Sequence, residues 1–264
     1  MRSHAVRWLA LWSLLLPLLV LSAYADSISL GSASGYAVLA GSTVTNTGST
    51  VLTGNLGVNP GCALTGAGTM TVSGTTNLCN AAAAKAQKDL TAAYIQAQSL
   101  KSTGTLTGKD LGGMTLTTGV YSFATSAQLT GTLTLEGKPG ALFVFQIGST
   151  LTTGSASSVI FINSLTGKPM TDPNIFWQVG SSATLGTSTA FEGNILALTS
   201  ITLNTSASIT CGSALARNGA VTLQGNTITS CGGGTTAVPE PGTLVLLGSG
   251  LITIAGVARR RMRS

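Results

Sequence analysis

A short phrase recurs at nearly constant spacing in the second half of this chain, and it constrains the fold more than any other feature. Each copy has a small or apolar residue, then Thr, then Leu, then Gly, Asn or Gln; the copies occupy residues 183–186, 201–204 and 221–224. A looser copy lies at residues 149–152. Alternation of this kind predicts a strand with the apolar side chain inward and the Thr outward. Repetition about every 20 residues predicts a solenoid, in which the outward Thr residues stack in a column.

The first 25 residues have the pattern of a secretory signal peptide. Arg2 and Arg7 precede an apolar run from Trp8 to Leu21. Ala23-Tyr24-Ala25 follows as a small-residue cleavage site. The alternative is an N-terminal membrane anchor. We assign residues 1–25 to a cleaved signal peptide, which predicts export.

The last 29 residues have a three-part pattern. Pro239-Glu240-Pro241 comes first, an apolar run over residues 243–258 comes next, and an Arg-rich cluster follows at residues 259–263. This order resembles the PEP-CTERM sorting segment that an exosortase recognises in Gram-negative bacteria. The resemblance implies that residues 236–264 anchor the protein transiently in a membrane, with the Arg cluster on the cytoplasmic side. An ordinary C-terminal anchor is the alternative.

The two end segments carry much of the positive charge. The chain has 13 Lys and Arg residues, of which six lie in these ends. Residues 26–238 therefore hold seven basic residues against six acidic ones, and they are rich in Thr, Ser, Gly and Ala. Nucleic-acid binding needs clustered Lys and Arg, so we expect no nucleic-acid partner.

One helix is predicted, over about residues 80–100. Asn80 suits the N-cap, an Ala run follows, and apolar residues recur at helical spacing as far as Leu100. Strands at residues 142–147, 175–179 and 195–198 are apolar on both sides, which is typical of strands buried on both faces. We expect the helix to cover the sheet that these strands form.

The order of the strands predicts three faces in each coil. The helix-covered face is followed by the face with the Thr column, and then by a third face that contains Leu133–Leu135, Val159–Ile162 and Ser208–Thr210. Residues 61–77 have no clear periodicity, and we interpret them as an irregular excursion from the solenoid. Four cysteines in an exported chain predict two disulfides with three possible pairings. Proximity in the sequence favours Cys62–Cys79 and Cys211–Cys231.

Several motifs resemble the microbial ice-binding (antifreeze) protein family. They are Tyr36–Gly41, Gly54–Val58, Phe176–Gly180, Gly193–Ala197 and Ala214–Val221, in that order. The resemblance covers nearly all of residues 29–230. It implies a mainly β fold, a discontinuous right-handed β-solenoid of triangular section with one long α-helix alongside, in a domain of residues 26–235. It also implies that a flat solenoid face not covered by the helix binds ice.

The chain lacks the residues for common enzymatic sites. Its single His is His4, inside the predicted signal peptide, so a mature Ser-His-Asp or Cys-His arrangement is excluded. The cysteines lack metal-ligand spacing, and the acidic residues are scattered. Arg217 is interpreted as a coil-edge residue, with a saccharide contact as the alternative. We therefore predict a protein that is not an enzyme and that needs no metal or cofactor.

The predicted ice-binding surface is the face with the Thr column, which we name the Thr face. It follows the helix-covered face in each coil, so the helix does not block it. We predict that the third face is the closest rival, with Thr115, Thr117, Thr132, Thr134 and Thr210, although it carries Glu136 and Glu192 and is interrupted by Ile160. The predicted outward residues of the Thr face are Thr43, Thr45, Gln128, Thr130, Thr150, Thr152, Thr184, Thr202, Asn204 and Thr222.

The predicted function is adsorption to ice that inhibits ice growth or recrystallisation. The alternative is a non-catalytic polysaccharide-binding or adhesive solenoid of the extracellular matrix; a solenoid glycosidase or lyase ranks third. The expected partners are the ice surface, the exosortase and translocation machinery, and exopolysaccharide as a further candidate. We expect a monomer at the periplasm, the cell surface or outside the cell.

Overall fold

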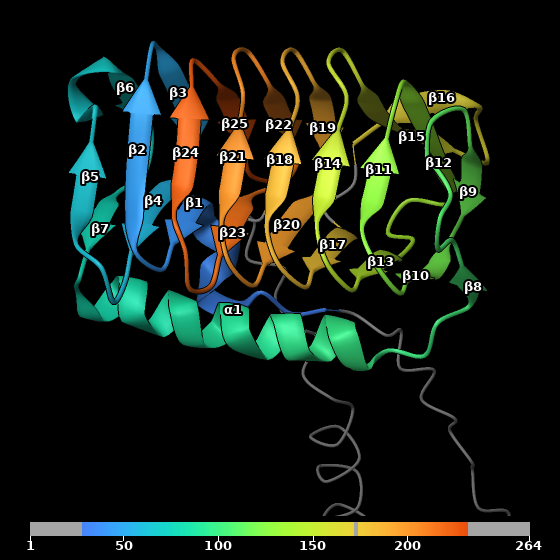
Figure 1. Ribbon diagram of the computed structural model, residues 1–264, viewed down its shortest axis with the longest axis horizontal. Coiled ribbons are helices and arrows are strands. Elements are labelled where there is room, and N and C mark those ends of the chain that lie inside the picture. The colour runs from blue at the N-terminus through green and yellow to red at the C-terminus, as the bar shows by residue number, and fades with distance from the viewer. Residues whose placement is uncertain (1–27, 172–173, 232–264) are drawn as a thin grey trace, which may run out of the picture.

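The computed structural model describes residues 28–171 and 174–231. These residues form a three-sided solenoid of almost entirely parallel strands, and one long helix lies along it (Figure 1). The predicted fold class is therefore confirmed. The predicted signal peptide (residues 1–25) and sorting segment (residues 236–264) lie outside the described residues.

Each side of the solenoid is one sheet. Sheet A, the helix-covered side, has the order β7 (Thr76–Leu78), β4 (Asn55–Val58), β1 (Tyr36–Ala40), β23 (Ala214–Ala216), β20 (Asn194–Ala197), β17 (Ile175–Val179), β13 (Phe143–Ile147), β10 (Gly119–Phe123) and β8 (Gly104–Thr105). Sheet B has the order β11 (Ala127–Leu129), β14 (Leu151–Thr153), β18 (Ala183–Leu185), β21 (Ile201–Leu203), β24 (Val221–Gln224), β2 (Thr43–Thr47) and β5 (Ala63–Thr65). Sheet C has the order β6 (Met70–Val72), β3 (Thr50–Thr53), β25 (Thr227–Thr229), β22 (Ser208–Thr210), β19 (Ala190–Glu192), β15 (Ser158–Asn163), β12 (Thr132–Gly137) and β9 (Thr115–Thr117). The chain passes from A to B to C in each coil, as predicted.

The solenoid is discontinuous in sequence. The chain builds coils at one end, runs back along sheet A as α1 (Ala81–Ser99), and resumes at β8 at the other end. Later coils then approach the first ones until β23, β24 and β25 pair with β1, β2 and β3. The first strands of the chain are thus inner strands of all three sheets.

Residues 61–77 are not an irregular excursion, and that prediction is wrong. They contain β5, the short 3₁₀ helix η2 (Ala67–Thr69), β6 and the start of β7, which form the terminal coil. Its inward side chains Leu64, Met70 and Val72 are only half-buried, because no further coil covers them. A coil at the end of a solenoid can therefore tolerate a weaker apolar pattern than an inner coil.

Helix α1 is fixed at both ends and along its length. The Asn80 side chain accepts a hydrogen bond from the Ala83 N–H at 2.9 Å, as the N-cap prediction requires. At the other end, the Gln146 side chain of β13 donates to the carbonyls of Ala97 and Leu100, each at 2.8 Å. These bonds satisfy carbonyls that a helix end leaves unpaired.

Apolar side chains fill two regions, one inside the solenoid and one between sheet A and α1. Inside, Phe145 and Trp177 stack with ring centroids 3.9 Å apart, and Trp177 also contacts Phe191. Both faces of the sheet A strands are therefore buried, as their continuous apolar sequences predict. No helix in the described part of the chain is long and apolar enough to cross a membrane.

Both predicted disulfides are present. Cys62–Cys79 joins the two ends of the terminal coil, with a Cα–Cα distance of 4.9 Å. Cys211–Cys231 joins the last two coils of the chain, with a Cα–Cα distance of 4.6 Å. The pairings that proximity favoured are confirmed.

Candidate functional site

The outward residues of sheet B stack in a continuous column. Strand register places Thr45 of β2 beside Thr222 of β24, which lies beside Thr202 of β21. The column continues through Thr184 and Thr152 to Gln128. We call this the central column, and it confirms the predicted stacking of one outward residue per coil.

The column is longer than the sequence predicted. Thr65 of β5 pairs with Thr45 and extends the column into the terminal coil. This residue was missed because residues 61–77 show no clear strand period. The signal that identifies it is the Leu64-Thr65 pair, which repeats the inward apolar residue and outward Thr of Val44-Thr45 and Val221-Thr222 in the same order.

Two further columns flank the central one. Two residues earlier, the stacking order is Thr150, Ser182, Ser200, Ala220 and Thr43, so Ala220 interrupts this column; the sequence analysis missed both serines. The hydroxyl of Thr150 donates to the Ser126 hydroxyl at 2.8 Å. Two residues later lie Thr130, Asn204 and Gln224, and Gln224 pairs with Thr47. Seven of the ten predicted residues lie at the outward positions of sheet B strands, and the other three, Thr130, Thr150 and Asn204, directly flank those strands.

The side chains of the Thr face have a regular grid of positions. Neighbouring strands lie about 4.8 Å apart, and residues i and i+2 on one strand lie about 6.7 Å apart. Most of these Thr residues are half-buried by their neighbours, so their rotamers are restricted. The branched methyl and hydroxyl groups therefore form a patterned surface.

Buried polar bonds stiffen the edge of the Thr face. Where sheet B turns into sheet C, the hydroxyls of Thr153 and Thr189 lie 2.8 Å apart, and Thr153 also accepts from the Gly186 N–H at 2.9 Å. In the next coils, the buried Asn226 amide donates to the carbonyls of Asn204 and Ala207, both at 2.9 Å. Such bonds in a desolvated position hold the backbone in one geometry.

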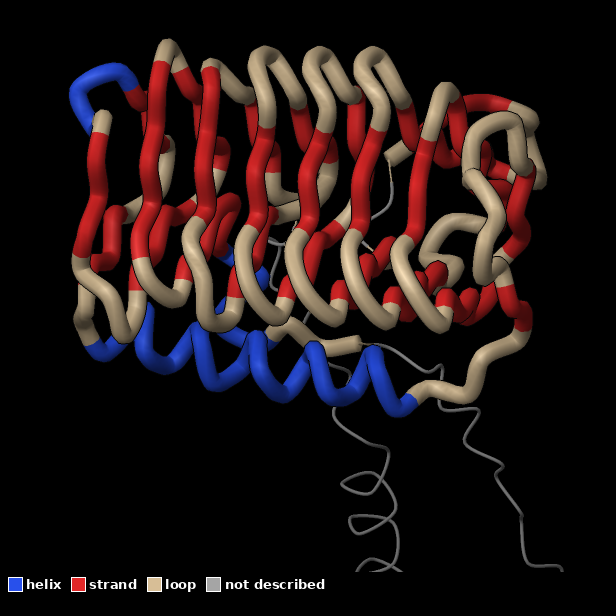
Figure 2. The backbone as a smooth tube through the Cα atoms, in the orientation of Figure 1, coloured by secondary structure: helices blue, strands red, loops and turns tan. Residues whose placement is uncertain are grey.

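The turns above this edge repeat closely. Ala156, Ser188 and Ser206 occupy the same place in three successive coils, with φ values of 55°, 57° and 59°. Figure 2 shows the three turns as neighbouring loops of the same shape. Because L-residues seldom adopt this conformation, three near-identical instances indicate that the coils repeat strictly.

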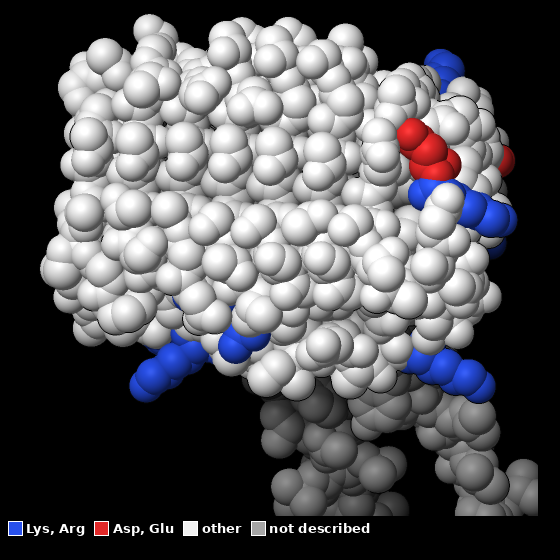
Figure 3. Space-filling view, viewed as in Figure 1, with Lys and Arg blue, Asp and Glu red and all other residues white. Residues whose placement is uncertain are grey.

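Charge is nearly absent from the Thr face. In Figure 3 the charged side chains gather at the β11 end of the solenoid and along the helix side, while the rest of the facing surface is uncharged. Asp110 forms an isolated parallel β-bridge with Gln128 and so lies at the end of the central column. Its carboxylate accepts hydrogen bonds from the Gly112 and Thr130 N–H groups, both at 2.8 Å. Burial alone would raise the pKa of Asp110, but these bonds outweigh it and lower the pKa.

The third face is less regular than the Thr face. Strand β16 (Lys168–Met170) pairs antiparallel with β15 where a parallel neighbour would continue the sheet. A cavity of about 310 Å³ lies beside it, lined by Ile160, Met170 and Phe191 among others. Thr115, Thr134 and Thr210 lie on sheet C. Thr115 pairs with Thr134, but Ile160 lies beside Thr134 on its other side and interrupts this column. In the neighbouring column, Ala190 lies between Ser158 and Ser208.

The two acidic residues of the third face, Glu136 and Glu192, differ in their exposure to solvent. Glu136 is exposed, as expected, whereas Glu192 is only 5% exposed. The expectation that both residues present a surface charge is therefore wrong for Glu192. The backbone carbonyl of Glu192 accepts a hydrogen bond from the Trp177 indole N–H at 3.1 Å.

Arg217 directly follows β23, in the connection from sheet A to sheet B, which agrees with the predicted coil-edge position. Its guanidinium lies 4.6 Å from the centroid of the Tyr94 ring of α1, and its Nε donates to Thr91 at 3.4 Å. These contacts give it a structural role in seating the helix. Within the described residues, no three His, Cys, Asp or Glu side chains lie together in a way that could hold a metal ion.

The sequence of the solenoid matches a known family model, described as Ice-binding-like, over residues 38–229, well over half of the chain. The protein belongs to the ice-binding-like family. A second model, the PEP-CTERM protein-sorting motif, matches residues 237–261. The two resemblances that the sequence suggested are therefore confirmed.

Relatives within the ice-binding family cover most of the chain. An ice-binding protein of Nostoc sp. is 53% identical over 91% of this chain and 90% of its own length. An ice-binding protein of Flavobacterium frigoris is 32% identical over 77% of this chain and 76% of its own length. The alternative of a polysaccharide-binding solenoid finds no support in these comparisons.

Solved structures of ice-binding proteins share the fold. One from an Antarctic biological consortium has a TM-score of 0.70 and 42% identity, covering 77% of this chain and 91% of its own. One from the Antarctic ascomycete Antarctomyces psychrotrophicus has a TM-score of 0.71 and 36% identity, covering 77% and 98%. The solenoid with its helix is thus the architecture of these ice-binding proteins.

Proposed function

We propose that this protein binds ice through the Thr face of sheet B and thereby inhibits the growth or recrystallisation of ice. Membership of the ice-binding family supports the activity. The observation that supports this face is the unbroken central column, in which six Thr residues from six strands stand side by side: Thr65, Thr45, Thr222, Thr202, Thr184 and Thr152.

The chemistry of the Thr face suits ordered water. The Thr methyl groups favour a cage-like arrangement of water, and the hydroxyl groups anchor that water by hydrogen bonds. Water held at regular positions can merge with the surface of an ice crystal. Since strongly hydrated ions would disturb such a layer, the lack of charge along the central column favours this role.

Rigidity makes the adsorption stronger. A mobile surface would lose conformational entropy when it ordered against ice. The buried bonds of Thr153 and Asn226 fix the backbone beneath and beside the columns before any ice is present. Binding therefore requires little reorganisation of the protein, and the proposed role involves no bond-making step, cofactor or metal.

The proposed site in the cell follows from the sorting motif. The match over residues 237–261 supports export of the protein and its anchoring in a membrane of a Gram-negative bacterium. We propose that the protein is exported through its signal peptide, handled by an exosortase and active as a monomer. Exopolysaccharide stays a predicted partner. Size-exclusion chromatography with light scattering tests the monomeric state, and a binding assay on purified polysaccharide tests the predicted partner.

The decisive experiment compares two matched substitutions. Thr202→Tyr places a ring in the middle of the central column, and Thr134→Tyr places the same ring on sheet C. We expect Thr202→Tyr to lose most of the thermal hysteresis and ice shaping, while Thr134→Tyr retains both. Outward surface changes cost within about 0.5 kcal/mol of stability, so the melting temperatures should stay close to that of the unmodified protein. Loss of activity in Thr134→Tyr alone would reassign the site to the third face.

A further inference from the structure

Sheet C consists of two unlike halves. Strand β16 and the cavity of about 310 Å³ lie beside β15 and β19 in one half. The other half consists of β6, β3, β25 and β22, which pair in continuous parallel register. Their inward side chains Leu52, Ile209 and Ile228 are buried, so the alternate residues point outward. We call these outward residues the C patch, and they are Val51, Thr53, Thr71, Ser208, Thr210, Thr227 and Thr229.

The C patch has two adjacent columns of side chains. The first contains, in stacking order, Ser208, Thr227, Val51 and Thr71, and the second contains Thr210, Thr229 and Thr53. Neighbours within a column lie about 4.8 Å apart, and the two columns lie about 6.7 Å apart. Val51 has the shape of Thr and is 43% exposed. Both columns therefore present β-branched methyl groups to water at regular positions.

The C patch resembles the Thr face in its chemistry. Within the part of the chain that the structure describes, the Thr hydroxyls of the C patch bond to no other protein group, so water can occupy them. In the other half of sheet C, by contrast, the hydroxyls of Thr132 and Ser158 lie 2.8 Å apart and bond to each other. The four strands of the C patch contain no charged residue. Glu192, beside Thr210 in the second column, is only 5% exposed.

The edge between the C patch and the Thr face is fixed by a chain of buried polar bonds. The Asn46 side chain donates to the Thr69 hydroxyl of the terminal coil at 3.0 Å and accepts from the Thr50 hydroxyl at 2.6 Å. Thr50 in turn accepts from the Asn226 N–H at 3.1 Å, and the Asn226 side chain donates to the Ala207 carbonyl at 2.9 Å. This chain of bonds runs through the same four coils whose strands form the C patch.

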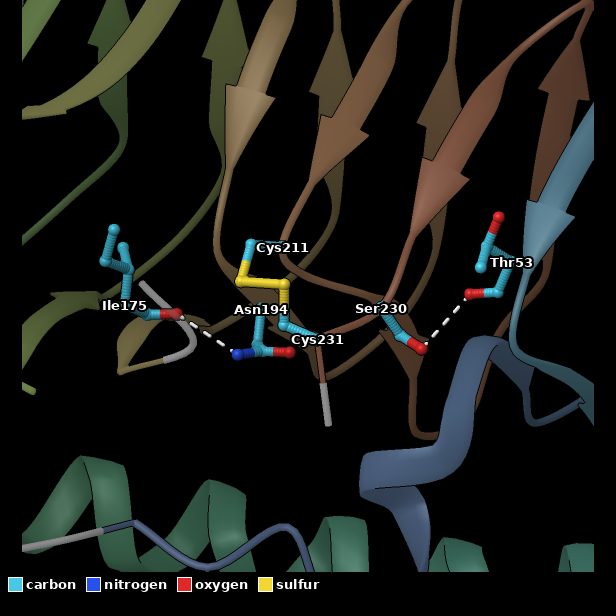
Figure 4. The surroundings of a disulfide bond; sticks show 6 residues. All are labelled: Thr53, Ile175, Asn194, Cys211, Ser230 and Cys231. Carbon is cyan, nitrogen blue, oxygen red and sulfur yellow. Dashed lines mark hydrogen bonds between the residues drawn. A yellow bond between two sulfur atoms is a disulfide. The ribbon is translucent and has the colours of Figure 1, made fainter. Parts of the chain in front are cut away.

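The opposite edge of the C patch is fixed as well (Figure 4). Cys211 directly follows β22 and Cys231 lies just after β25, so their disulfide joins the ends of these two strands. The Ser230 N–H donates to the Thr53 carbonyl at 3.0 Å and the Ser230 hydroxyl donates to it at 3.1 Å, which joins β25 to β3. Because both edges are held before any ice is present, adsorption costs the C patch little conformational entropy.

The C patch and the Thr face meet at one edge and point in different directions. In Figure 1 the turns at the top lead from β2, β24 and β21 of sheet B to β3, β25 and β22 of sheet C, which lie behind them. The two surfaces also differ in pattern. The Thr face has one unbroken column, and Ala220 interrupts the column beside it, whereas the C patch has two adjacent columns of mostly β-branched residues. A different pattern of methyl and hydroxyl groups matches a different plane of ice.

We propose that the C patch is a second, smaller ice-contacting surface, which adsorbs to a set of ice planes different from the set that the Thr face binds. This inference rests on the proposed function, because it assumes that regular methyl and hydroxyl groups on a rigid, uncharged sheet bind ice. The C patch spans four strands and the Thr face spans seven, so adsorption through the C patch is the weaker of the two. At a step on the ice surface, the two surfaces can contact two planes at once.

The experiment identifies the ice planes that the protein covers. The purified protein carries a fluorescent dye on its lysines, none of which lies in the Thr face or the C patch, and a single crystal of ice is grown into the solution. Thr202→Tyr places a ring in the central column and Thr227→Tyr places one in the C patch. Thr132→Tyr is the matched control, because Thr132 is exposed like Thr227 and lies in the same column, beyond Ala190 and Ser158.

We expect the unmodified protein to label two sets of planes, one strongly and one weakly. Thr202→Tyr should lose the strong set and keep the weak one, whereas Thr227→Tyr should lose the weak set and keep the strong one. Thr132→Tyr should keep both sets, and the variant with both Thr202→Tyr and Thr227→Tyr should label no plane. Loss of both sets in Thr202→Tyr alone, or an unchanged pattern in Thr227→Tyr, would overturn the inference and leave the proposed function intact.

The remaining outcomes are distinct from these. If the unmodified protein labels no plane and shows no thermal hysteresis, the proposed function itself fails. If Thr227→Tyr alone loses all labelling, the C patch is the main site and the assignment of the Thr face fails. A dimer in light scattering that Thr227→Tyr dissociates would show that a second copy occupies the C patch, which overturns the inference. Outward substitutions change stability little; if Thr227→Tyr nevertheless melts lower, Thr229→Tyr in the second column repeats the test.

Discussion

Thr45 and Thr222 lie side by side in sheet B, although one belongs to the second strand of the chain and the other to its next-to-last strand. Their pairing joins the coils built before α1 to the coils built after it. The Thr face is continuous only because the solenoid closes in this way. If the Thr face binds ice as proposed, its activity depends on both halves of the chain.

This closure predicts unequal effects along the central column. Thr222 has Thr neighbours on both sides, whereas Thr65 lies on the terminal strand β5 and has a Thr neighbour only on one side. Thr222→Tyr should remove most of the thermal hysteresis because the ring keeps ice from both halves of the column. Thr65→Tyr should retain more than half of it. Equal losses in the two variants would show that the column does not act as one continuous surface.

The repeats made most of the fold and of the Thr face predictable. The Thr-Leu phrase in the last three coils set the inward and outward sides, and register then placed Thr184, Thr202 and Thr222 together as expected. The apolar strands such as Phe143–Ile147 correctly indicated the side that α1 covers. A strict repeat carries this information because every inner coil has the same neighbours on each side.

The less predictable parts are those where this repetition ends. Thr65 lies in the terminal coil, whose inward residue Leu64 is only half-buried and gives a weak pattern. Strand β16 pairs antiparallel with the second half of β15, beyond its pairing with β19, and no repeated sequence pattern predicts it. Glu192 is buried, and its backbone carbonyl bonds to the Trp177 indole N–H, a contact between residues of two different sheets. Such features arise from the packing of particular side chains, and they leave no repeating pattern in the sequence.

Asp89 gives the fold an acid-sensitive contact. It lies on α1, accepts hydrogen bonds from the Ser32 side chain and N–H, and pairs with Lys85 at 3.0 Å. The bond from the Ser32 side chain is the largest cause that lowers the pKa of Asp89, to about 2 from the ordinary 3.8. Because the pKa is lower in the folded state, this contribution to stability is present above about pH 4 and is lost as the pH falls toward 2.

We therefore expect Asp89→Asn to lower the melting temperature at pH 7 by a few degrees. This corresponds to about 1 kcal/mol, since solvent screens the partly exposed carboxylate. Melting curves from pH 7 to pH 2 should converge for the variant and the unmodified protein at the acid end. Lys85→Met is the control: the Lys85 side chain is 68% exposed, so its loss should change little. Parallel curves for Asp89→Asn over the whole range would contradict the assignment.

The two disulfides should protect different parts of the molecule. Cys62 and Cys79 are 17 residues apart and close the terminal coil, while Cys211 and Cys231 are 20 residues apart and close the last coil of the chain. Replacing either pair by Ala should cost about 3 kcal/mol in the chain-entropy account. Hydrogen exchange should rise in β5–β7 for the first double variant and in β25 for the second. Exchange that rises uniformly over the solenoid in both variants would show that the coils do not open locally.

Gln146 is a single polar residue in the apolar strand β13, and it fixes the end of the helix. Its side-chain amide donates to the carbonyls of Ala97 and Leu100, and these groups have no partner from a further helical turn. Gln146→Met keeps the length of the side chain but removes the donors. We expect a loss of about 1 kcal/mol, because these hydrogen bonds are only partly buried and water can replace part of what is lost.

The measurement is a melting temperature together with hydrogen exchange in the last turn of α1. Gln146→Met should melt several degrees lower and exchange faster around residues 97–100, while thermal hysteresis near 0 °C stays unchanged because the Thr face belongs to sheet B. Gln98→Met is the matched control: Gln98 is exposed on the same turn, and its replacement should stay within about 0.5 kcal/mol. If the two variants melt at the same temperature, the Gln146 bonds do not hold the helix, and the apolar contacts of Ala97 and Tyr94 with sheet A suffice to seat it.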